Sequence, residues 1–313
     1  MSKPLLILEN VNVDYGNAPI LRDITMVVKP GEIVGVVGES GSGKSTAIYA
    51  TLGILGKGGK VVNGTITYDG RDLKNMAPEA KRALRGSELS LIAQDPVTSF
   101  HPIRKIRSEL YELVSAHGGM TRQQAEEEML RAMEKISLRD GQRILSHYAF
   151  ELSGGMCQRT SIAMAMVLKP RILFADEPTS ALDVTVQKQV VEEMMKIRDD
   201  SGTAIFMVSH NMGVVAHMSD YIYVMLSGRI MECGSKDDII HRTAHPYTKN
   251  LISVIPRMNA PAPRGVSLRE PDRNVAGYCP FRQNCDCKSP DCGDKVPPIR
   301  EISPGHYVRC HCV

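Results

Sequence analysis

A glycine-rich stretch near the N-terminus has the composition and spacing of a phosphate-binding loop. Residues 38–46, GESGSGKST, follow the apolar run EIVGVVG and precede a helical pattern, which is the context that such a loop requires. Backbone N–H groups and the helix N-terminus would bind phosphate oxygens, Lys44 would reach the β and γ phosphates, and Ser45 would bind Mg²⁺. A glycine-rich turn with an incidental lysine is the plainer alternative. The predicted binding residues are Gly38, Ser40, Gly41, Ser42, Gly43, Lys44, Ser45 and Thr46.

Two adjacent carboxylates follow the apolar run RILFA later in the chain. Asp176 and Glu177 would stand at the end of a buried strand, where an enzyme with such a loop needs acidic groups. Asp176 would hold the Mg²⁺ shell, and Glu177 would act on the attacking water. A pair of this kind can also simply cap the next helix, but the glycine-rich loop upstream favours the catalytic interpretation.

The elements that must position these groups alternate along the chain. The apolar runs EIVGVVG, RILFAD and TAIFMVSH each precede a helical pattern, which is typical of a parallel α/β sheet. The segments LLILENVNVDYG and ITMVVKPGE favour antiparallel strands, and DYIYVMLSGRIMECGS favours a hairpin that turns at Ser227 and Gly228. Residues 98–150 have a helical pattern, and Thr121 with Gln124 predicts a capping box.

Composition excludes several classes of protein. The net charge of the 313-residue chain is only +3, so no electrostatic field for nucleic acid is indicated. The apolar runs are much shorter than the about 20 residues of a membrane span, and the N-terminal run LLIL is too short for a signal peptide. The chain is therefore expected to stay in the cytosol, where clustered cysteines more often hold metal than form disulfides.

A second anion site is predicted at residues 152–159, LSGGMCQR. Ser153, Gly154 and Gly155 would present a hydroxyl and backbone N–H groups at a helix N-terminus. The stretch resembles the signature motif of the ATP-binding-cassette (ABC) family. Cys157 stands where that motif more usually has a basic or polar side chain, and it is interpreted as a tolerated small residue, with redox sensing as the alternative.

Four further motifs of the ABC family match in order between residue 5 and about residue 255. The resemblance implies that Tyr15 stacks on adenine, that Gln94 in AQDP is the Q-loop residue and an Mg²⁺ ligand, that Asp183 ends the D-loop SALD, and that His210 in VSHN is the switch histidine. Taken singly, these residues have plainer alternatives: Tyr15 as a packing residue, Gln94 as a surface side chain, and His210 as a core or loop histidine. Only their order and spacing favour the family.

The resemblance implies a fold and a reaction. The fold is a P-loop ATPase core of the α/β class with an antiparallel β subdomain and a helical subdomain at about residues 98–150, within a nucleotide-binding domain of residues 1–255. The reaction is ATP hydrolysis with Mg²⁺, for which Glu177, His210 and Gln94 are the catalytic candidates. ABC proteins hold each ATP between the loop of one subunit and the signature of another, and this chain has one copy of each, so it must pair.

Two further segments resemble the dipeptide, oligopeptide and nickel importers of this family: AQDPVTSFHP, in which Leu and Asn are commoner than Phe100 and His101, and AHPYTKNLI at residues 244–252. The expected partners are a second ABC ATPase in a heterodimer, two membrane permeases and an extracytoplasmic binding protein, at the cytoplasmic face of the membrane. The cargo would be peptides, nickel or a related small solute. A soluble ABC ATPase acting on nucleic acid or ribosomes, and a redox-sensing regulator, are the alternatives.

Residues 278–313 hold six of the eight cysteines. Cys279, Cys285, Cys292 and Cys310 resemble the C-terminal extension of peptide-transporter ATPases, some of which carry a [4Fe-4S] cluster; zinc or no metal are the alternatives. Residues 256–313 are therefore interpreted as a linker and a Cys-rich extension that a metal centre holds together. The extension is expected to be separate from the nucleotide domain, which would have its own core.

Overall fold

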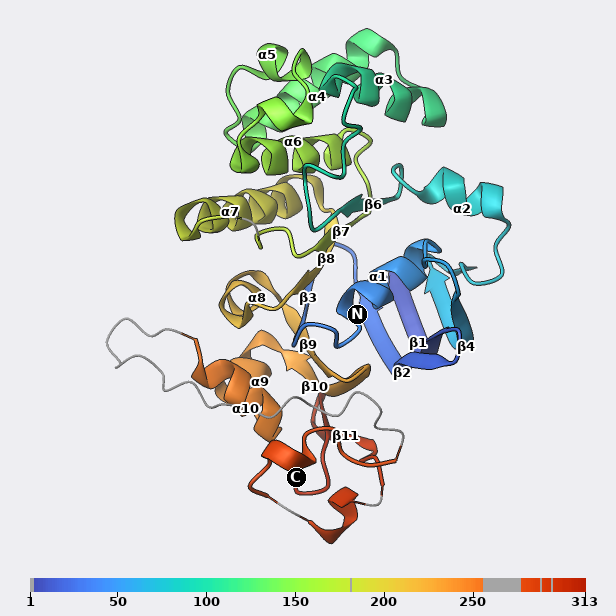
Figure 1. Ribbon diagram of the computed structural model, residues 1–313, viewed down its shortest axis with the longest axis vertical. Helices are drawn as coiled ribbons and strands as arrows, with labels where there is room; N and C mark the ends of the chain where they lie inside the picture. Colours follow the sequence, from blue (N-terminus) through green and yellow to red (C-terminus); the bar gives the residue numbers. More distant parts are fainter. Residues whose placement is uncertain (1–2, 181, 256–276, 288, 294) are drawn as a thin grey trace. The chain divides into compact units, whose positions relative to one another are not determined.

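The computed structural model describes residues 3–180, 182–255, 277–287, 289–293 and 295–313. The chain divides into two compact units: residues 1–3, 29–33 and 75–207 form the first, and residues 4–28, 34–74 and 208–313 form the second. Figure 1 labels most of the helices and strands of both. Among the described residues, no helix combines the length and the apolar character that crossing a membrane requires.

The first unit combines parallel strands with a group of helices. Strand β6 (Leu89–Ile92) pairs in parallel with β7 (Ile172–Asp176), and β8 (Ala204–Ser209) follows β7 in the sheet order. All five residues of β7 are buried, as expected for a strand of a parallel sheet that is covered on both faces. The helices are α2 (Pro78–Leu84), α3 (Ile106–His117), α4 (Arg122–Lys135), α5 (Gly141–Leu145), α6 (Gly154–Met166) and α7 (Val184–Ser201).

Three of these helices, α3, α4 and α5, occupy the segment for which the sequence predicts a helical region. The predicted capping box begins α4: the Gln124 N–H donates to Thr121 Oγ1 at 3.2 Å, and the Thr121 N–H donates to Gln124 Oε1 at 2.8 Å. Ala125, Met129 and Met133 are buried one helical turn apart. In Figure 1 these helices lie beside α6, which carries the signature motif.

The second unit begins with a four-stranded antiparallel sheet in the order β2-β1-β4-β5. The predicted antiparallel strands are thus confirmed. Alternate apolar side chains of β1 are fully buried, which is the pattern of a strand that faces the core on one side. The strands are β1 (Leu6–Tyr15), β2 (Ala18–Val28), β4 (Gly59–Tyr68) and β5 (Arg71–Asp72).

A second group of strands in this unit leads into and away from the glycine-rich loop. β3 (Ile33–Gly38) runs parallel to β9 (Tyr221–Leu226). β9 then pairs antiparallel with β10 (Arg229–Ser235), and the turn lies at Ser227 and Gly228, whose φ angles are 46° and 74°, so the predicted hairpin is confirmed. The helices of this unit are α1 (Lys44–Leu52), α8 (Met212–Met218), α9 (Lys236–His241) and α10 (Pro246–Ser253).

The described part of the Cys-rich extension continues this same sheet. β12 (His306–Arg309) pairs antiparallel with β10, and β11 (Ile299–Ser303) pairs with β12. The expectation that the extension and the nucleotide domain have separate cores is therefore corrected, because β12 takes its ladder bonds from β10, a strand within residues 1–255. The predicted boundary at residues 255 and 256 adjoins residues outside the described ranges and stays a prediction.

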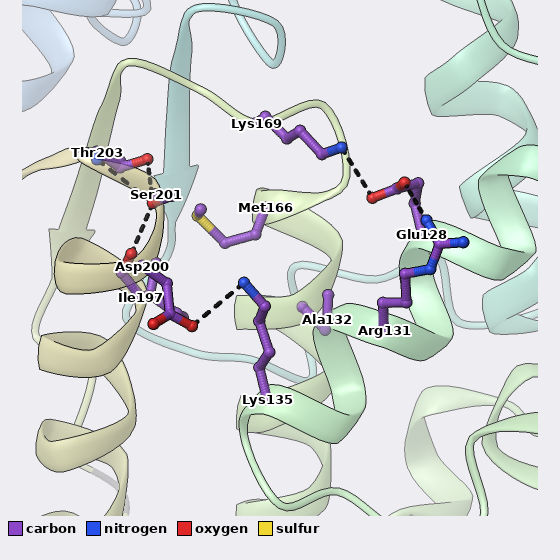
Figure 2. A pocket seen from close by; sticks show the side chains of 11 residues that line it. Glu128, Arg131, Ala132, Lys135, Met166, Lys169, Ile197, Asp200, Ser201 and Thr203 are labelled. Carbon is purple, nitrogen blue, oxygen red and sulfur yellow. Dashed lines mark hydrogen bonds and ion pairs between the residues drawn. The ribbon is translucent and has the colours of Figure 1, made fainter.

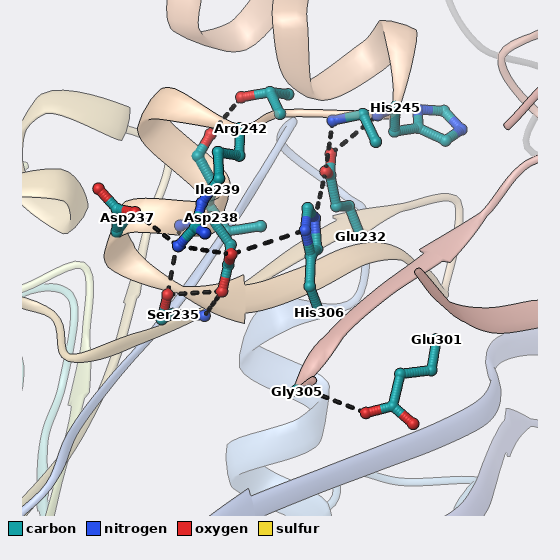
Figure 3. Close-up of polar contacts among 12 residues, drawn as sticks. Glu232, Ser235, Asp237, Asp238, Ile239, Arg242, His245, Glu301, Gly305 and His306 are labelled. Atoms are coloured by element: carbon teal, nitrogen blue, oxygen red, sulfur yellow. Dashed lines mark hydrogen bonds and ion pairs between the residues drawn. The ribbon is translucent and has the colours of Figure 1, made fainter. Parts of the chain in front are cut away.

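A buried polar network holds the extension to β10 (Figure 3). The Glu232 side chain is fully buried, and its carboxylate accepts the backbone N–H groups of Ala244 and His245 at 2.8 and 3.1 Å. His306 Nε2 lies 2.8 Å from Glu232 Oε1, and His306 Nδ1 lies 3.8 Å from Asp238. A buried carboxylate is tolerated only when donors surround it, so Glu232 requires both α10 and β12 to be in place.

Glu232 provides a test of this anchorage. Glu232→Gln keeps the size of the side chain but places an amide where three donors converge, so we expect the free energy of unfolding to fall by about 2 to 3 kcal/mol. The control is Glu301→Gln, because the Glu301 carboxylate also accepts a backbone N–H, that of Gly305 at 2.8 Å, but is exposed; this variant should change stability by about 0.5 kcal/mol or less. Urea unfolding measures both, and equal losses would contradict the role of Glu232.

Candidate functional site

The glycine-rich loop connects β3 to α1 in the second unit, as the sequence predicts. β3 is buried along its whole length and ends at Gly38, and α1 begins at Lys44. Lys44 Nζ donates to the carbonyl oxygens of Gly38 and Glu39, both at 2.9 Å, and the side chain is only 5% exposed. The ammonium group is thus held beneath the loop by the loop's own carbonyl groups.

Two positions in this loop accept only glycine. A Cβ at Gly38 would lie 2.1 Å from the backbone oxygen of Met225 in β9, so the close approach of the two strands excludes any side chain. Gly43 has φ of 94°, and its Cβ would lie 2.5 Å from Leu21 Cδ2. The left-handed conformation at Gly43 turns the chain into α1.

A small hollow of about 180 Å³ lies beside the loop. Residues 39–42 form one wall, and the Ser227–Gly228 turn and the start of β2 form the others. The Gly228 N–H donates to the Ser42 carbonyl at 3.0 Å. Ser42 Oγ is buried and has no hydrogen-bond partner among the described residues, so this part of the loop retains capacity to bind a polar group.

Tyr15 and His210 belong to the same unit. Tyr15 ends β1 and is half-buried; a Cβ at Gly59 would come within 2.9 Å of its ring, so the ring packs over Gly59. His210 directly follows β8 and is exposed. The next residue, Asn211, caps α8 by accepting the N–H groups of residues 213 and 214, which fixes the backbone beside the histidine.

The first unit gathers the predicted carboxylates and Gln94 at one edge of its sheet. Asp176 is the last residue of β7 and is 1% exposed. Glu177 follows it with φ of 50° and is half-buried. Gln94 lies two residues beyond the end of β6, is exposed, and follows a strand that pairs in parallel with β7. Because neighbouring parallel strands end at the same edge, the topology brings these three residues to one side.

The signature residues occupy the N-terminus of α6, as predicted. Ser153 is the N-cap, and its Oγ accepts the N–H of Met156 at 3.3 Å. Ser153 and Gly154 are exposed, and a Cβ at Gly154 would meet no atom within 4 Å. Packing within the described residues therefore does not require glycine at this position, and the helix N-terminus is open to an anion from outside.

Cys157 and Asp183 have structural roles that the chain itself explains. Cys157 is fully buried in α6, and burial, with a smaller effect of Asp95, raises the pKa of its thiol to about 11; this favours the tolerated small residue over a redox sensor. The Asp183 carboxylate caps α7 by accepting the N–H groups of Thr185 and Val186 at 3.1 and 3.0 Å. Asp183 thus fixes the start of α7, a capping role that the D-loop motif does not predict.

Among the described residues, the tail cysteines form no disulfide. The four predicted ligands, Cys279, Cys285, Cys292 and Cys310, are each 9% exposed or less, whereas Cys287 is exposed and Cys312 is half-buried. The described residues contain no group of three or more His, Cys, Asp or Glu side chains arranged to hold a metal ion. The metal centre predicted here therefore lacks support from the side-chain geometry.

A hollow of about 400 Å³ lies in the first unit and contains none of the predicted site residues (Figure 2). Its charged side chains pair with one another. Glu128 accepts from Lys169 at 3.1 Å and from Arg131 at 2.8 Å, and Lys135 lies 3.2 Å from Asp200. These ion pairs occupy the charged groups of the hollow with one another, so the hollow offers no sign of the predicted chemistry.

Comparison with known proteins decides the family. Residues 21–180 match the protein family described as ABC transporter. The chain belongs to the ABC transporter family. As a member of it, the chain is an ATP-hydrolysing transporter subunit. Residues 231–292 also match the family described as oligopeptide/dipeptide transporter, C-terminal region.

Relatives cover almost the whole ABC subunit. It is 35% identical to an oligopeptide transport ATP-binding protein of Salmonella typhimurium over 94% of the chain and 88% of that protein. It is 38% identical to a probable peptide ABC transporter ATP-binding protein of Sinorhizobium fredii, over 95% and 91%. A solved ATP-binding subunit of an ABC transporter, 26% identical, superposes with a TM-score of 0.63 over 76% of this chain and 92% of that one. A solved bacterial ABC transporter cassette is 23% identical and superposes with a TM-score of 0.66 over 74% of this chain and 98% of that one, which supports the fold.

The two kinds of glycine in the site make opposite predictions for stability. Gly38→Ala should lower the free energy of unfolding by about 2 kcal/mol or more, because its Cβ meets a strand backbone. Gly154→Ala should change it by about 0.5 kcal/mol or less, because the Cβ has open space. Thermal unfolding of both variants checks this, and a large loss for Gly154→Ala would show that the signature glycine is a packing residue.

Proposed function

We propose that this ABC subunit lies at the cytoplasmic face of the membrane and there powers the import of peptides. The observation that carries the proposal is the match of two segments, the cassette and the region at residues 231–292, to families of transporters, with relatives named as peptide-transport ATP-binding proteins along more than 90% of the chain. The partners would be two permeases and an extracytoplasmic binding protein. The alternative of a soluble ABC ATPase for nucleic acid or ribosomes gains nothing from these relatives.

The residues of the second unit would bind the nucleotide. Lys44 is the cation nearest to the loop backbone and would exchange its contact with carbonyl groups for the β and γ phosphates. Ser45 would bind Mg²⁺, Tyr15 would stack on adenine, and His210 would contact the γ phosphate. The remaining loop residues would contribute backbone N–H groups and hydroxyls; these are Gly38, Ser40, Gly41, Ser42, Gly43 and Thr46.

The residues of the first unit would carry out the chemistry. Buried Asp176 would complete the Mg²⁺ shell together with Gln94, and Glu177 would polarise the attacking water. The position of Glu177 supports this role, because it directly follows buried β7, its φ of 50° turns the chain there, and it is half-buried at the end of the strand. Mg²⁺ supplies charge neutralisation of the phosphates when bound.

A second subunit would complete each site. Ser153, Gly154 and Gly155 lie at a helix N-terminus at which Ser153 and Gly154 are exposed, and Gly154 has no neighbour within the described residues that explains the missing side chain. A nucleotide phosphate held by the loop of a partner subunit fits this open position, with Asp183 at the start of α7 near the dimer contact. We propose a heterodimer with a related ABC ATPase.

Glu177 is the most direct test of the hydrolysis mechanism. Glu177→Gln keeps the shape and removes the negative charge, so ATP should still bind while turnover falls roughly 10²-fold or more. ATP turnover is measured in the assembled transporter with the catalytic glutamate of the partner ATPase also replaced. Turnover near that of the parent complex would remove Glu177 from the mechanism.

We further propose that Cys279, Cys285, Cys292 and Cys310 hold a [4Fe-4S] cluster, with zinc as the alternative. The support is chemical: four buried thiols sit in a segment with few apolar residues, and thiolates are the ligands that such a cluster requires. Their described positions form no ready metal site, so binding would have to draw the thiols together. The cluster would act as a structural staple.

Anaerobic purification tests the cluster. The chain should be brown and contain about four irons, and replacing any of the four ligands by Ser should expose the tail to protease. Cys287→Ser and Cys312→Ser should be milder, and Cys233→Ser, which removes a buried thiol of β10, controls for loss of a core cysteine. If the chain contained stoichiometric zinc and no iron, zinc would take the place of the cluster in this proposal. If the chain contained neither metal, both the cluster and the zinc alternative would be wrong.

A further inference from the structure

A tyrosine of α10 reaches the glycine-rich loop. The backbone N–H of Glu39, the first residue of the loop after β3, donates to the hydroxyl oxygen of Tyr247 at 3.1 Å. The carbonyl of the same residue accepts from Lys44 Nζ at 2.9 Å. The Gly38 carbonyl, which belongs to the same peptide group as the Glu39 N–H, also accepts from Lys44 Nζ at 2.9 Å, so the Tyr247 phenol and the Lys44 ammonium hold the two sides of one peptide group.

Tyr247 is itself fixed by the packing around it. Its side chain is fully buried, and burial raises the pKa of its phenol, so the hydroxyl stays neutral and available to accept. The Tyr247 N–H donates to His245 Nδ1 at 3.0 Å. Burial lowers the pKa of His245 to about 4, so this ring is neutral at neutral pH and its Nδ1 can accept that hydrogen bond.

The Cys-rich extension supplies the other wall of the Tyr247 site. Phe281 lies between Cys279 and Cys285, is 2% exposed, and packs its ring against Tyr247 with centroids 5.5 Å apart and an interplanar angle of 57°. It also faces the His245 ring at 6.1 Å. Tilted aromatic pairs of this kind contribute more than their buried area alone, so Phe281 restricts the position from which the Tyr247 hydroxyl reaches the loop.

A second connection reaches the same helix. His306 of β12 contacts Glu232, whose carboxylate accepts the N–H of His245 at 3.1 Å, immediately before α10 (Figure 3). The extension therefore holds the start of α10 through Glu232 and the side of Tyr247 through Phe281. The route through Glu232 ends at His245, whose Nδ1 accepts the Tyr247 N–H, and the route through Phe281 ends at Tyr247 itself.

We propose that Tyr247 is a positioning residue for the phosphate-binding loop, and that the Cys-rich extension tunes nucleotide affinity through the contact of Phe281 with Tyr247. Tyr247 acts on the loop backbone: it sets the peptide group between Gly38 and Glu39, and thereby the place of Lys44, which donates to the carbonyl of that group. Loss or rearrangement of the extension would loosen the loop and weaken ATP binding, contrary to the expectation of an independent nucleotide domain.

The test measures equilibrium binding of a fluorescent ATP analogue with Mg²⁺ to the full-length subunit. Tyr247→Phe keeps the ring and removes one hydrogen bond, so the Kd should rise roughly fivefold. Tyr223→Phe is the matched control, because Tyr223 is a buried tyrosine of the same unit whose hydroxyl also accepts a backbone N–H, that of Val27 at 2.9 Å. This control should lower the unfolding midpoint and leave the Kd unchanged.

Phe281 tests whether the extension acts through Tyr247. Phe281→Leu should raise the Kd about threefold in the parent chain and leave it unchanged in the Tyr247→Phe chain, because coupled residues are not additive. In the assembled transporter, Tyr247→Phe should raise the KM for ATP and leave kcat within about twofold. An unchanged Kd for Tyr247→Phe, an equal rise for Tyr223→Phe, or an equal effect of Phe281→Leu in both backgrounds would overturn the proposal.

Discussion

A phosphate-binding loop must be rigid while keeping its N–H groups for the ligand, and this constraint orders the second unit. Several described contacts meet it through carbonyl groups, whereas the N–H groups of Glu39 and Ser42 donate to Tyr247 and to the Glu39 carbonyl. Lys44 Nζ donates to the carbonyl oxygens of Gly38 and Glu39, and the Gly228 N–H donates to the carbonyl oxygen of Ser42. A buried ammonium group is costly unless acceptors surround it, so these carbonyls also stabilise Lys44 where the loop needs positive charge.

The β9–β10 hairpin helps to meet this constraint, and it contacts both the glycine-rich loop and the Cys-rich extension. Its turn at Gly228 holds the loop, and the Met225 carbonyl closes the space that forces glycine at position 38. Its other end carries Glu232, which binds the start of α10 and His306 of the extension. One hairpin thus supports the loop and the Cys-rich segment together, so the two cannot have independent cores.

Part of this structure could be predicted from residues close together in the sequence. The loop depends on glycine spacing, the capping box on Thr121 and Gln124, and the hairpin on the residues of its turn, all signals within a few neighbouring positions. The pairing of β10 with β12 could not be predicted, because it joins Cys233 to Tyr307 across a long stretch without a periodic signal. An acidic residue inside an apolar strand, as at Glu232, was the one available sign that buried donors had to arrive from elsewhere.

That buried carboxylate also explains how so short a ladder keeps its register. The recorded pairs between β10 and β12 are Glu232 with Val308 and Cys233 with Tyr307. His306 lies two residues from Val308 and therefore on the same face as Glu232, as a diagonal neighbour. A slip of β12 by one residue would turn His306 to the opposite face and leave a fully buried carboxylate without that partner. The polar contact therefore adds to the register specificity of a ladder with few recorded pairs.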